Sequence, residues 1–408
     1  MNKKLIFIIC LIIYLIAAFV TEIFYRNKLY KKSIEYIEKI KQNGFFHYFY
    51  FFWSMIFLYG MMAVGILLTF IFYPINIFYC HLSVEIFFIF IMCILKSLYS
   101  NSRPYWDIYS SRQGNETIKF LPKPTECDGE FGNPSGHSML STYILILWDL
   151  FLKSKFFENL ERKRQLITKY ITLIISLVFI AFVTYSRINR QIHSFNQIIF
   201  GAILGFSICF TFCHILELNK IETKIFMENI HNYKFIIIPI FIILFIISVI
   251  LGLFRHNKNE DKYEFILKMY CNFGKGEMFG KNTAYTSSLI FVLIGGFIGL
   301  LFLRNKIIKN HPEKENKFYD WNKGKKVNTL KIALFTLILS AIILIPVLFI
   351  KHYIAKFIVS SFLFFFFGFC LFGLILYYAC KIFKKNEIEV EIKIFINNGN
   401  NENIVGDI

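Results

Sequence analysis

The sequence lacks the signatures of several common classes of protein. It contains no cysteine and histidine spacing typical of a zinc site, no phosphate-binding P-loop and no heptad repeat. The nine cysteines follow no regular framework. Acidic residues are few, 27 against 45 Lys and Arg, which gives a formal net charge of +18. These absences argue against a zinc finger, a P-loop nucleotide-binding domain and a coiled coil.

Apolar residues, in contrast, are abundant. The chain is 56% hydrophobic and 19% aromatic, with a mean hydropathy of +0.54. That is too apolar for a soluble globular domain and predicts an all-α, polytopic integral membrane protein. The basic residues fall mostly in loops between apolar runs, where they set the topology and contact anionic headgroups. We therefore expect membrane lipids as partners, and no nucleic acid.

Hydropathy and charge divide the chain into five regions. Residues 1–20 form an apolar run after two lysines, a signal anchor or a signal peptide with a poor cleavage site. Residues 21–46 are basic and predict an amphipathic helix on the membrane surface. Residues 47–215 form a core that carries three motifs, and 216–383 add C-terminal transmembrane helices. The tail 384–408 is polar and expected to be mobile.

The number of transmembrane helices follows from the length of the apolar runs. A membrane-spanning helix needs about 20 residues, so the chain is expected to have nine to ten of them, counting the first run. The nine that follow it are expected near 47–73, 80–99, 137–153, 168–186, 194–215, 234–254, 286–303, 330–350 and 356–381.

The orientation of these spans follows from their loops. The connections 153–169 and 304–331 are strongly basic, which places both in the cytosol under the positive-inside rule. The loops 100–136, 187–193 and 255–285 then share the opposite face. The basic stretch 21–45 argues against this scheme, because it would also lie on that face.

Two further features bear on the non-cytosolic face. Asn115-Glu116-Thr117 is a glycosylation acceptor in the loop 100–136. Cys127 and Cys271 lie in loops on the same predicted side and could pair in an oxidising lumen, although spacing alone does not establish the bond. We expect an endoplasmic reticulum, other endomembrane or plasma membrane protein with a lumenal or extracellular site.

The first motif is Lys96 followed by Arg103 and Pro104. Seven residues are close to two helical turns, so both cations can point to the same side of a helix end. A lysine this close to the end of a membrane span is costly unless it snorkels or meets an anion. The motif is thus either a phosphate-binding pair or a snorkelling lysine with an interfacial arginine.

The second motif is Pro134-Ser135-Gly136-His137. Proline and serine before an apolar run predict a helix start, whose unpaired N–H groups favour phosphate oxygens. Gly136 permits a close approach of the backbone to a ligand. His137 lies in the first turn, where it can reach a leaving-group oxygen. A capped helix with an interfacial histidine is the plainer interpretation.

The third motif runs from Ser186 and Arg187 to His193. Arg187 offers a planar fork of donors suited to phosphate oxygens. His193 can attack phosphorus if one ring nitrogen is unprotonated. Gln197 lies four residues further on and can accept from the other ring nitrogen, fixing the tautomer. Three cations, a helix start and two histidines on one face predict a phosphate-handling site.

The three motifs resemble the signatures K-x6-RP, PSGH and SR-x5-H of the type 2 phosphatidic acid phosphatase and haloperoxidase-like superfamily. The resemblance covers about 100 residues and implies a helical-bundle core with metal-free, cofactor-free catalysis. It implies that His193 is the nucleophile that forms a phosphohistidine, and that His137 protonates the leaving group and later activates water. Further residues would bind the phosphoryl oxygens: Lys96, Arg103, Ser135, Gly136 and Arg187.

One position departs from the commonest pattern of this superfamily. Many members carry Asp four residues after the nucleophile, where this chain has Gln197. Glucose-6-phosphatases and dolichyl diphosphatases are similar in this respect. Arg103-Pro104-Tyr105-Trp106, and the spacing from Cys127 to the second motif, are also similar to glucose-6-phosphatase. The subgroup is left open.

The resemblance implies an acid phosphatase acting on phosphomonoesters, with lipid phosphates such as phosphatidate as the default substrate. A sugar phosphate and a polyprenyl diphosphate are alternatives of the same class. A lipid phosphotransferase would use the same phosphohistidine with an alcohol in place of water. A non-catalytic phosphate or lipid binder is the alternative from another class. The oligomeric state is not predicted.

Overall fold

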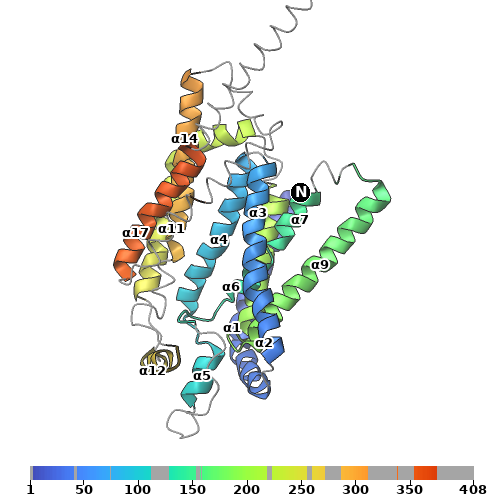
Figure 1. Cartoon of the computed structure of the whole chain (residues 1–408), viewed down its shortest axis with the longest axis vertical. Helices are drawn as coiled ribbons and strands as arrows, with labels where there is room; N and C mark the ends of the chain where they lie inside the picture. Colours follow the sequence, from blue (N-terminus) through green and yellow to red (C-terminus); the bar gives the residue numbers. More distant parts are fainter. Residues whose placement is uncertain are drawn as a thin grey trace, which may run out of the picture.

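A computed structural model describes residues 3–40, 44–73, 75–111, 128–152, 157, 159–217, 223–254, 260–271, 286–310, 338 and 353–374. Within these ranges the chain forms helices, turns and loops and no strand (Figure 1). This confirms the all-α fold class. The helices are α1 (Lys3–Lys39), α2 (Gly44–Phe51), η1 (Phe52–Phe57), α3 (Leu58–Phe72), α4 (Ile75–Tyr99), α5 (Pro104–Ser111), α6 (Gly136–Ser141), α7 (Ile144–Leu152), α9 (Arg162–Asn189), α10 (Phe195–Phe210), η3 (Thr211–Ile215), α11 (Thr223–Phe254), α12 (Glu260–Cys271), α14 (Ile290–Asn310), α17 (Tyr353–Phe369) and η8 (Cys370–Leu374).

Seven helices of the described part are long and apolar enough to cross a membrane, which supports a membrane protein. The expected count of nine to ten stays a prediction. The segment expected near 137–153 is the shorter apolar helix Gly136–Leu152, and α14, which begins at Ile290, covers most of the segment expected near 286–303. The segment expected near 330–350 lies outside the described residues, apart from residue 338.

The N-terminal helix α1 differs from the expected division at residue 20. It runs without interruption through the apolar run and most of the basic segment. No Gly or Pro occurs between residues 21 and 39, so nothing in the sequence stops the helix where the polarity changes. Glu22, Ser33 and Ile37 are buried in this second half, so it packs against the protein.

The helix α4 lies at the centre of the fold, between α3 on one side and α11 with α14 on the other (Figure 1). Its apolar window is 61% buried, more than that of the other candidate spans among the described residues. On one face, Val84 and Phe88 pack in a core with Met139. On the other, Tyr79 packs with α14 and donates a hydrogen bond to Leu293 O at 3.0 Å.

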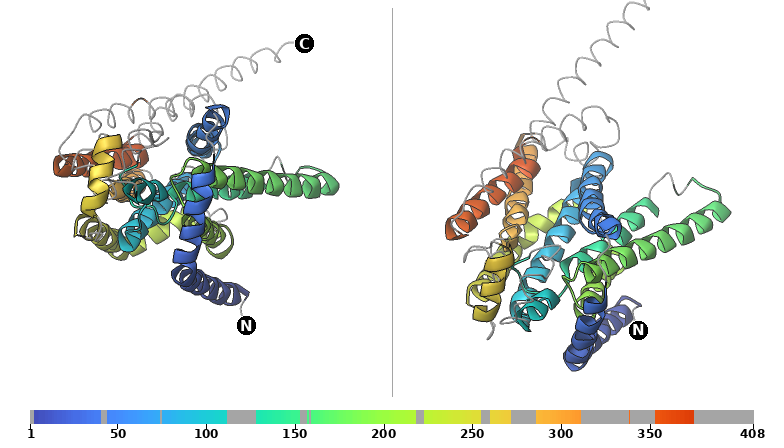
Figure 2. Two further views of the ribbon diagram at one scale, coloured as in Figure 1. Left: turned by 90° about the horizontal axis from the view of Figure 1, so that it is seen from below. Right: turned by 60° about the horizontal axis from the view of Figure 1, so that its bottom comes forward.

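The helix α9 projects away from the others, as both views of Figure 2 show. One of its sides carries a band of exposed apolar residues. Apolar side chains suit contact with lipid, because they need no hydrogen-bond partner and the hydrocarbon offers none. The band includes Leu166, Tyr170, Ile171 and Ile174.

Glycines let α10 approach α6 closely. A Cβ atom on Gly201 would lie 2.5 Å from Ser135 O, and one on Gly205 would lie 2.6 Å from Met139 O. Both of these neighbours are backbone atoms, which cannot turn aside as a side chain can. The two glycines therefore fix the start of α6 beside the start of α10.

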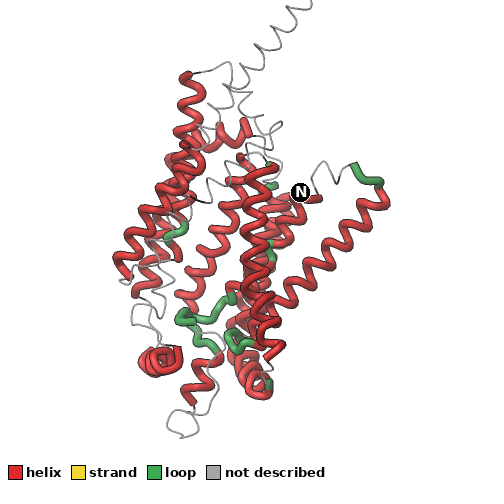
Figure 3. The backbone as a smooth tube through the Cα atoms, viewed as in Figure 1, coloured by secondary structure: helices red, strands yellow, loops and turns green. Residues whose placement is uncertain are grey.

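The loops that follow α4 and precede α6 and α10 meet at one end of the bundle (Figure 3). The N–H of Gly132 donates to Asn101 O at 2.8 Å, and the N–H of Ser135 donates to Gln197 O at 3.0 Å. These backbone bonds join stretches that are far apart in the sequence. The fold thus brings the three sequence motifs to the same end.

Candidate active site

Two of the predicted phosphate-binding cations are buried at the end of α4 and the start of α5. Lys96 is 5% exposed and Arg103 is 0% exposed. Buried cations need anions, because removing a charge from water is costly. Lys96 Nζ lies 2.7 Å from Glu130 Oε2, and Arg103 Nη2 lies 2.5 Å from Asp128 Oδ2. Arg103 Nε also donates to Glu130 O at 2.6 Å.

Arg187, the third cation, is fully buried near the end of α9. The chain turns back over it, because Arg187 O accepts from the N–H groups of Ile192 at 3.1 Å and His193 at 3.3 Å. Gln191 makes this turn with a φ of 62°. Arg190 donates to Ser54 Oγ at 3.2 Å, and its charge also acts on His137. The turn is what brings His193 over Arg187.

The helix start predicted at Ser135 is present. Ser135 is the N-cap of α6, and its Oγ accepts from the N–H of Ser138 at 3.5 Å. A Cβ atom on Gly136 would lie 2.1 Å from Met92 Sδ, so α4 packs directly against this turn. The helix therefore begins where the sequence predicted it.

His137 lies in the first turn of α6 and is partly exposed. Its Nε2 lies 3.2 Å from Met55 Sδ. Its ring packs edge-on against the ring of Tyr59, with 5.6 Å between the ring centroids. Arg187, Lys96 and other site cations are close enough to act on it electrostatically. His137 is therefore on the side of the site that η1 and α3 cover.

Gln197 fixes the hydrogen-bonding state of His193. Gln197 Nε2 donates to Ser102 O at 2.8 Å, and Gln197 Oε1 accepts from the N–H of Ser194 at 3.2 Å. His193 Nδ1, 3.2 Å from that same Oε1, must then be the donor. The contact that the sequence predicted between the two side chains is therefore present.

The other ring nitrogen of His193 faces a donor that cannot accept. His193 Nε2 lies 3.3 Å from Arg103 Nη1, and a guanidinium has no acceptor. Nε2 is therefore unprotonated, with its lone pair on the side of the cations. This is the state that nucleophilic attack on phosphorus requires.

The surroundings also keep His193 neutral. Burial lowers the pKa of His193 well below its usual range, and the positive charges of Arg103, Arg187 and Lys96 lower it further. The histidine is 2% exposed, so water screens these charges poorly. A neutral imidazole is thus maintained to a lower pH than for a free histidine.

Asp128 and Glu130 are site residues that the sequence interpretation missed. The pKa of Asp128 is lowered: burial acts to raise it, but Arg103, Lys96 and the N–H of Glu130 together outweigh burial. Both acids lie between the first two motifs and match neither. The signal that could have found them is the need of two buried cations for counter-charges.

A second missed group links α1 to the site. Glu22 is 6% exposed in α1, and its Oε1 accepts from Asn133 Nδ2 at 2.8 Å and Asn196 Nδ2 at 3.5 Å. Arg26 Nη2 lies 2.6 Å from its Oε2. Asn133 precedes the second motif, and Asn196 is in the first turn of α10. One carboxylate therefore holds the loop before α6 and the first turn of α10.

A third missed group surrounds Asp107 on α5. Its Oδ2 accepts from Tyr30 at 2.5 Å and from Ser102 Oγ at 2.6 Å, and its Oδ1 accepts from Tyr263 at 2.5 Å. These partners come from α1, the loop before α5, and α12. Because Ser102 O accepts from Gln197, this group supports the residue that orients His193.

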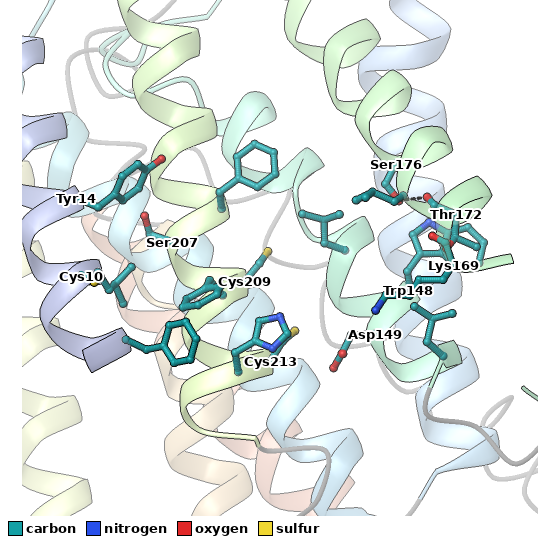
Figure 4. Close-up of a pocket in the computed structure, with 18 of the residues that line it drawn as sticks. Cys10, Tyr14, Trp148, Asp149, Lys169, Thr172, Ser176, Ser207, Cys209 and Cys213 are labelled. Carbon is teal, nitrogen blue, oxygen red and sulfur yellow. Dashed lines mark hydrogen bonds between the residues drawn. The ribbon is translucent and has the colours of Figure 1, made fainter. Parts of the chain in front are cut away.

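An apolar cavity of about 870 Å³ lies elsewhere, between α1, α7, α9 and α10 (Figure 4). Its wall includes Tyr14, Trp148, Lys169 and Cys213. None of the predicted site residues lines it. It forms no part of the candidate active site.

The structure reports on one of the two cysteines expected to pair. Cys271 is disulfide-bonded. Cys127 lies outside the described residues, as does the glycosylation acceptor at Asn115. The proposed Cys127–Cys271 bond stays a prediction.

The structure thus shows a helical protein with seven candidate membrane spans among its described residues and a site of buried cations and imidazoles at one end. Residues 77–221 match the family model of the PAP2 superfamily, which supports membership of that superfamily. The matched stretch contains all eight predicted site residues. Superfamily members are phosphatases, so the match supports an enzyme of phosphatase type. No curated protein and no solved structure matches the chain significantly.

Proposed function

We propose that the chain is an integral-membrane phosphatase that hydrolyses phosphomonoesters through a phosphohistidine on His193. The observation that carries the proposal is the state of this residue. Its Nδ1 donates to Gln197, and its Nε2 is unprotonated beside Arg103. A nucleophilic nitrogen with a fixed tautomer, next to buried cations that bind phosphoryl oxygens, suits phosphoryl transfer.

In the first step, the lone pair of His193 Nε2 attacks phosphorus, and the bond from phosphorus to the ester oxygen breaks. His137 donates a proton to that oxygen, which leaves as an alcohol. Lys96, Arg103 and Arg187 balance the charge of the transferred group, and the start of α6 supplies N–H donors. The new phosphorus–nitrogen bond holds the intermediate.

In the second step, His137 takes a proton from water, and the resulting hydroxide oxygen attacks phosphorus. The phosphorus–nitrogen bond breaks and returns its electron pair to His193 Nε2. Inorganic phosphate is released, and both histidines return to their initial states. Neither step requires a metal ion or a cofactor.

For the substrate, we propose a lipid phosphate such as phosphatidate, because the site lies at the end of membrane-spanning helices, where such headgroups are found. A sugar phosphate is the second candidate, favoured by the glucose-6-phosphatase-like sequence from Arg103 to Trp106 and by Gln197. We place the site on the lumenal or extracellular face, on the charge of the loops.

The test is phosphate release by the purified, detergent-solubilised protein, with and without EDTA. Phosphatidate, glucose 6-phosphate and a polyprenyl diphosphate are offered in parallel, and the His193→Ala variant is the blank. We expect EDTA-resistant release from phosphatidate that is absent from the variant. Activity lost with EDTA and restored by magnesium would rule out the metal-free mechanism.

Two other results would redirect the proposal. If no substrate releases phosphate, but an added alcohol becomes phosphorylated, the chain is a phosphotransferase with the same intermediate. If neither reaction occurs and His193→Ala leaves phosphate binding intact, the site binds without catalysis.

A further inference from the structure

The candidate active site already contains two anions of the chain itself. Asp128 and Glu130 contact Arg103 and Lys96, two of the cations assigned to the phosphate. The carboxylates are the more exposed partners: the side chains of Asp128 and Glu130 are 28% and 14% exposed, against 0% and 6% for the cations. The carboxylates are therefore the partners in both ion pairs that are more open to solvent and to an incoming phosphate.

The two carboxylates are held very differently. Asp128 Oδ1 accepts from the N–H of Glu130 at 2.9 Å, while its Oδ2 binds Arg103. Its backbone N–H and C=O both bond to Tyr105 Oη, at 3.0 and 2.8 Å. Asp128 is thus fixed through side chain and backbone and acts as a positioning residue for Arg103.

The side chain of Glu130, in contrast, is held by a single hydrogen bond, to Lys96, among the described residues. Its backbone oxygen binds Arg103 Nε at 2.6 Å, and the N–H of Gly132, two residues on, bonds to Asn101 O. The backbone is therefore fixed on both sides of a side chain that can rotate. The Glu130 carboxylate can leave Lys96 without moving the loop.

We propose that the Glu130 carboxylate occupies the phosphate-binding position at Lys96 in the free protein. A phosphoryl group must displace this carboxylate in order to bind there. This rests on the proposed phosphatase function of the same site. Glu130 then competes with substrate and product for one cation and sets the affinity of the site for phosphate.

The charges of the site also indicate which ligand can displace the Glu130 carboxylate most favourably. With Glu130 displaced, Lys96, Arg103 and Arg187 face the single carboxylate of Asp128. Among the three cations assigned to the phosphate, Asp128 balances one positive charge. The other two match the charge of a phosphomonoester dianion. A phosphodiester carries one negative charge and would replace one carboxylate by an equal charge. Glu130 thus favours monoesters over diesters.

The test measures equilibrium binding of inorganic phosphate and orthovanadate to the purified full-length protein, from the rise in melting temperature with ligand concentration. The variants are Glu130→Gln, which keeps the shape and removes the charge, and Glu130→Ala, which removes the carboxylate. Glu161→Gln is the matched control, because Glu161 pairs with Arg164 at 3.5 Å on an exposed surface away from the site. Melting without ligand shows that each variant is folded.

We expect both Glu130 variants to bind phosphate and vanadate about tenfold more tightly than the wild type, since the ligand no longer breaks a charged hydrogen bond. Glu161→Gln should bind as the wild type does. Equal or weaker binding by both Glu130 variants, beside clear binding by the wild type, would overturn the proposal and make Glu130 a positioning residue for Lys96.

Failure of the proposed function would look different. If the chain has no phosphate site, neither the wild type nor any variant binds phosphate or vanadate, and the competition is ruled out as well. A site that binds without catalysis would bind both ligands but release no phosphate from any substrate. A monoester-to-diester hydrolysis ratio that is the same in the wild type and in Glu130→Gln would contradict the selectivity alone.

Discussion

At His193, two neighbours decide which nitrogen can react. Gln197 has its amide group fixed by Ser102 and Ser194, so it presents an acceptor to Nδ1. Arg103 presents only donors to Nε2. A neutral amide therefore orients the ring as a carboxylate would, although it stabilises an imidazolium less.

The same environment gives a prediction for the pH dependence of the reaction. Only neutral His193 can attack phosphorus, and burial together with Arg103 and Arg187 lowers its pKa. Activity on the acid side should therefore be lost at a pH below about 6.5, the value for an unperturbed histidine. The measurement is the pH profile of kcat/KM with a soluble phosphomonoester. An acid limb at or above that pH would contradict the burial of a neutral imidazole.

Single residues also show what sequence spacing can and cannot predict. The motif cations and histidines could be found because each lies within seven residues of a partner in its motif. Glu22 could not, because its partners Asn133 and Asn196 lie 111 and 174 residues away. Asp128 and Glu130 could not be assigned, because their roles depend on how Lys96 and Arg103 are buried.

At the scale of elements, α1 extends the site beyond the stretch that matches the PAP2 family model, which begins at residue 77. Its Glu22 holds the loop before α6 and the first turn of α10. A buried carboxylate in a membrane helix is costly unless it is paired, and this one is bound by Arg26 as well. We infer that α1 organises this loop and the start of α10.

A substitution in α1 tests this role. In the wild type, the two carboxylate oxygens of Glu22 accept from Asn133, Asn196 and Arg26. The Glu22→Gln variant keeps only one acceptor oxygen, so we expect the free energy of unfolding to fall by about 1–3 kcal/mol. We also expect kcat/KM for phosphate release to fall, because both loops lose a support. Glu35→Gln, on the exposed side of the same helix, is the control. Equal activity in the two variants would show that α1 anchors the chain without supporting the site.

The close packing of α6 on α10 gives a second prediction at this scale. Gly201→Ala would place a methyl group 2.5 Å from Ser135 O, so α6 must shift. Overpacking of this kind typically costs about 1–3 kcal/mol, and here it displaces the helix start of the site. Gly60→Ala is the matched control, with no atom within 4 Å of the new methyl group. Melting temperature and phosphate release should fall for Gly201→Ala alone.

For the molecule as a whole, the sequence correctly indicated helices in the described part of the chain and apolar segments long enough to cross a membrane, because long apolar runs are compatible with few other structures. It did not indicate that α4 lies between α3 on one side and α11 with α14 on the other, since both faces of α4 are apolar. Nor did it show that α1 continues past residue 20, because the polarity changes there while helix formation does not.

Which face of the membrane the site occupies is a property of the whole chain. Arg164, near the start of α9, and Arg187, near its end, are separated by about 35 Å at 1.5 Å per residue, so α9 is long enough to place its two ends on different sides of a bilayer. Arg187 is in the site, and the first turn of α9 carries Arg162, Lys163 and Arg164. The positive-inside rule therefore predicts a cytosolic Arg164 and a non-cytosolic site.

Cysteine labelling in sealed microsomes tests this arrangement. Arg164 and Ser111 are both exposed, and Ser111 ends α5 beside the site. We expect a membrane-impermeant maleimide to label the Arg164→Cys variant directly, and the Ser111→Cys variant only after the vesicles are permeabilised. The native protein is the blank for its own thiols. The reverse pattern would place the site in the cytosol. The candidate substrates would then be cytosolic phosphate esters in place of lumenal ones, and Asn115 could not be glycosylated.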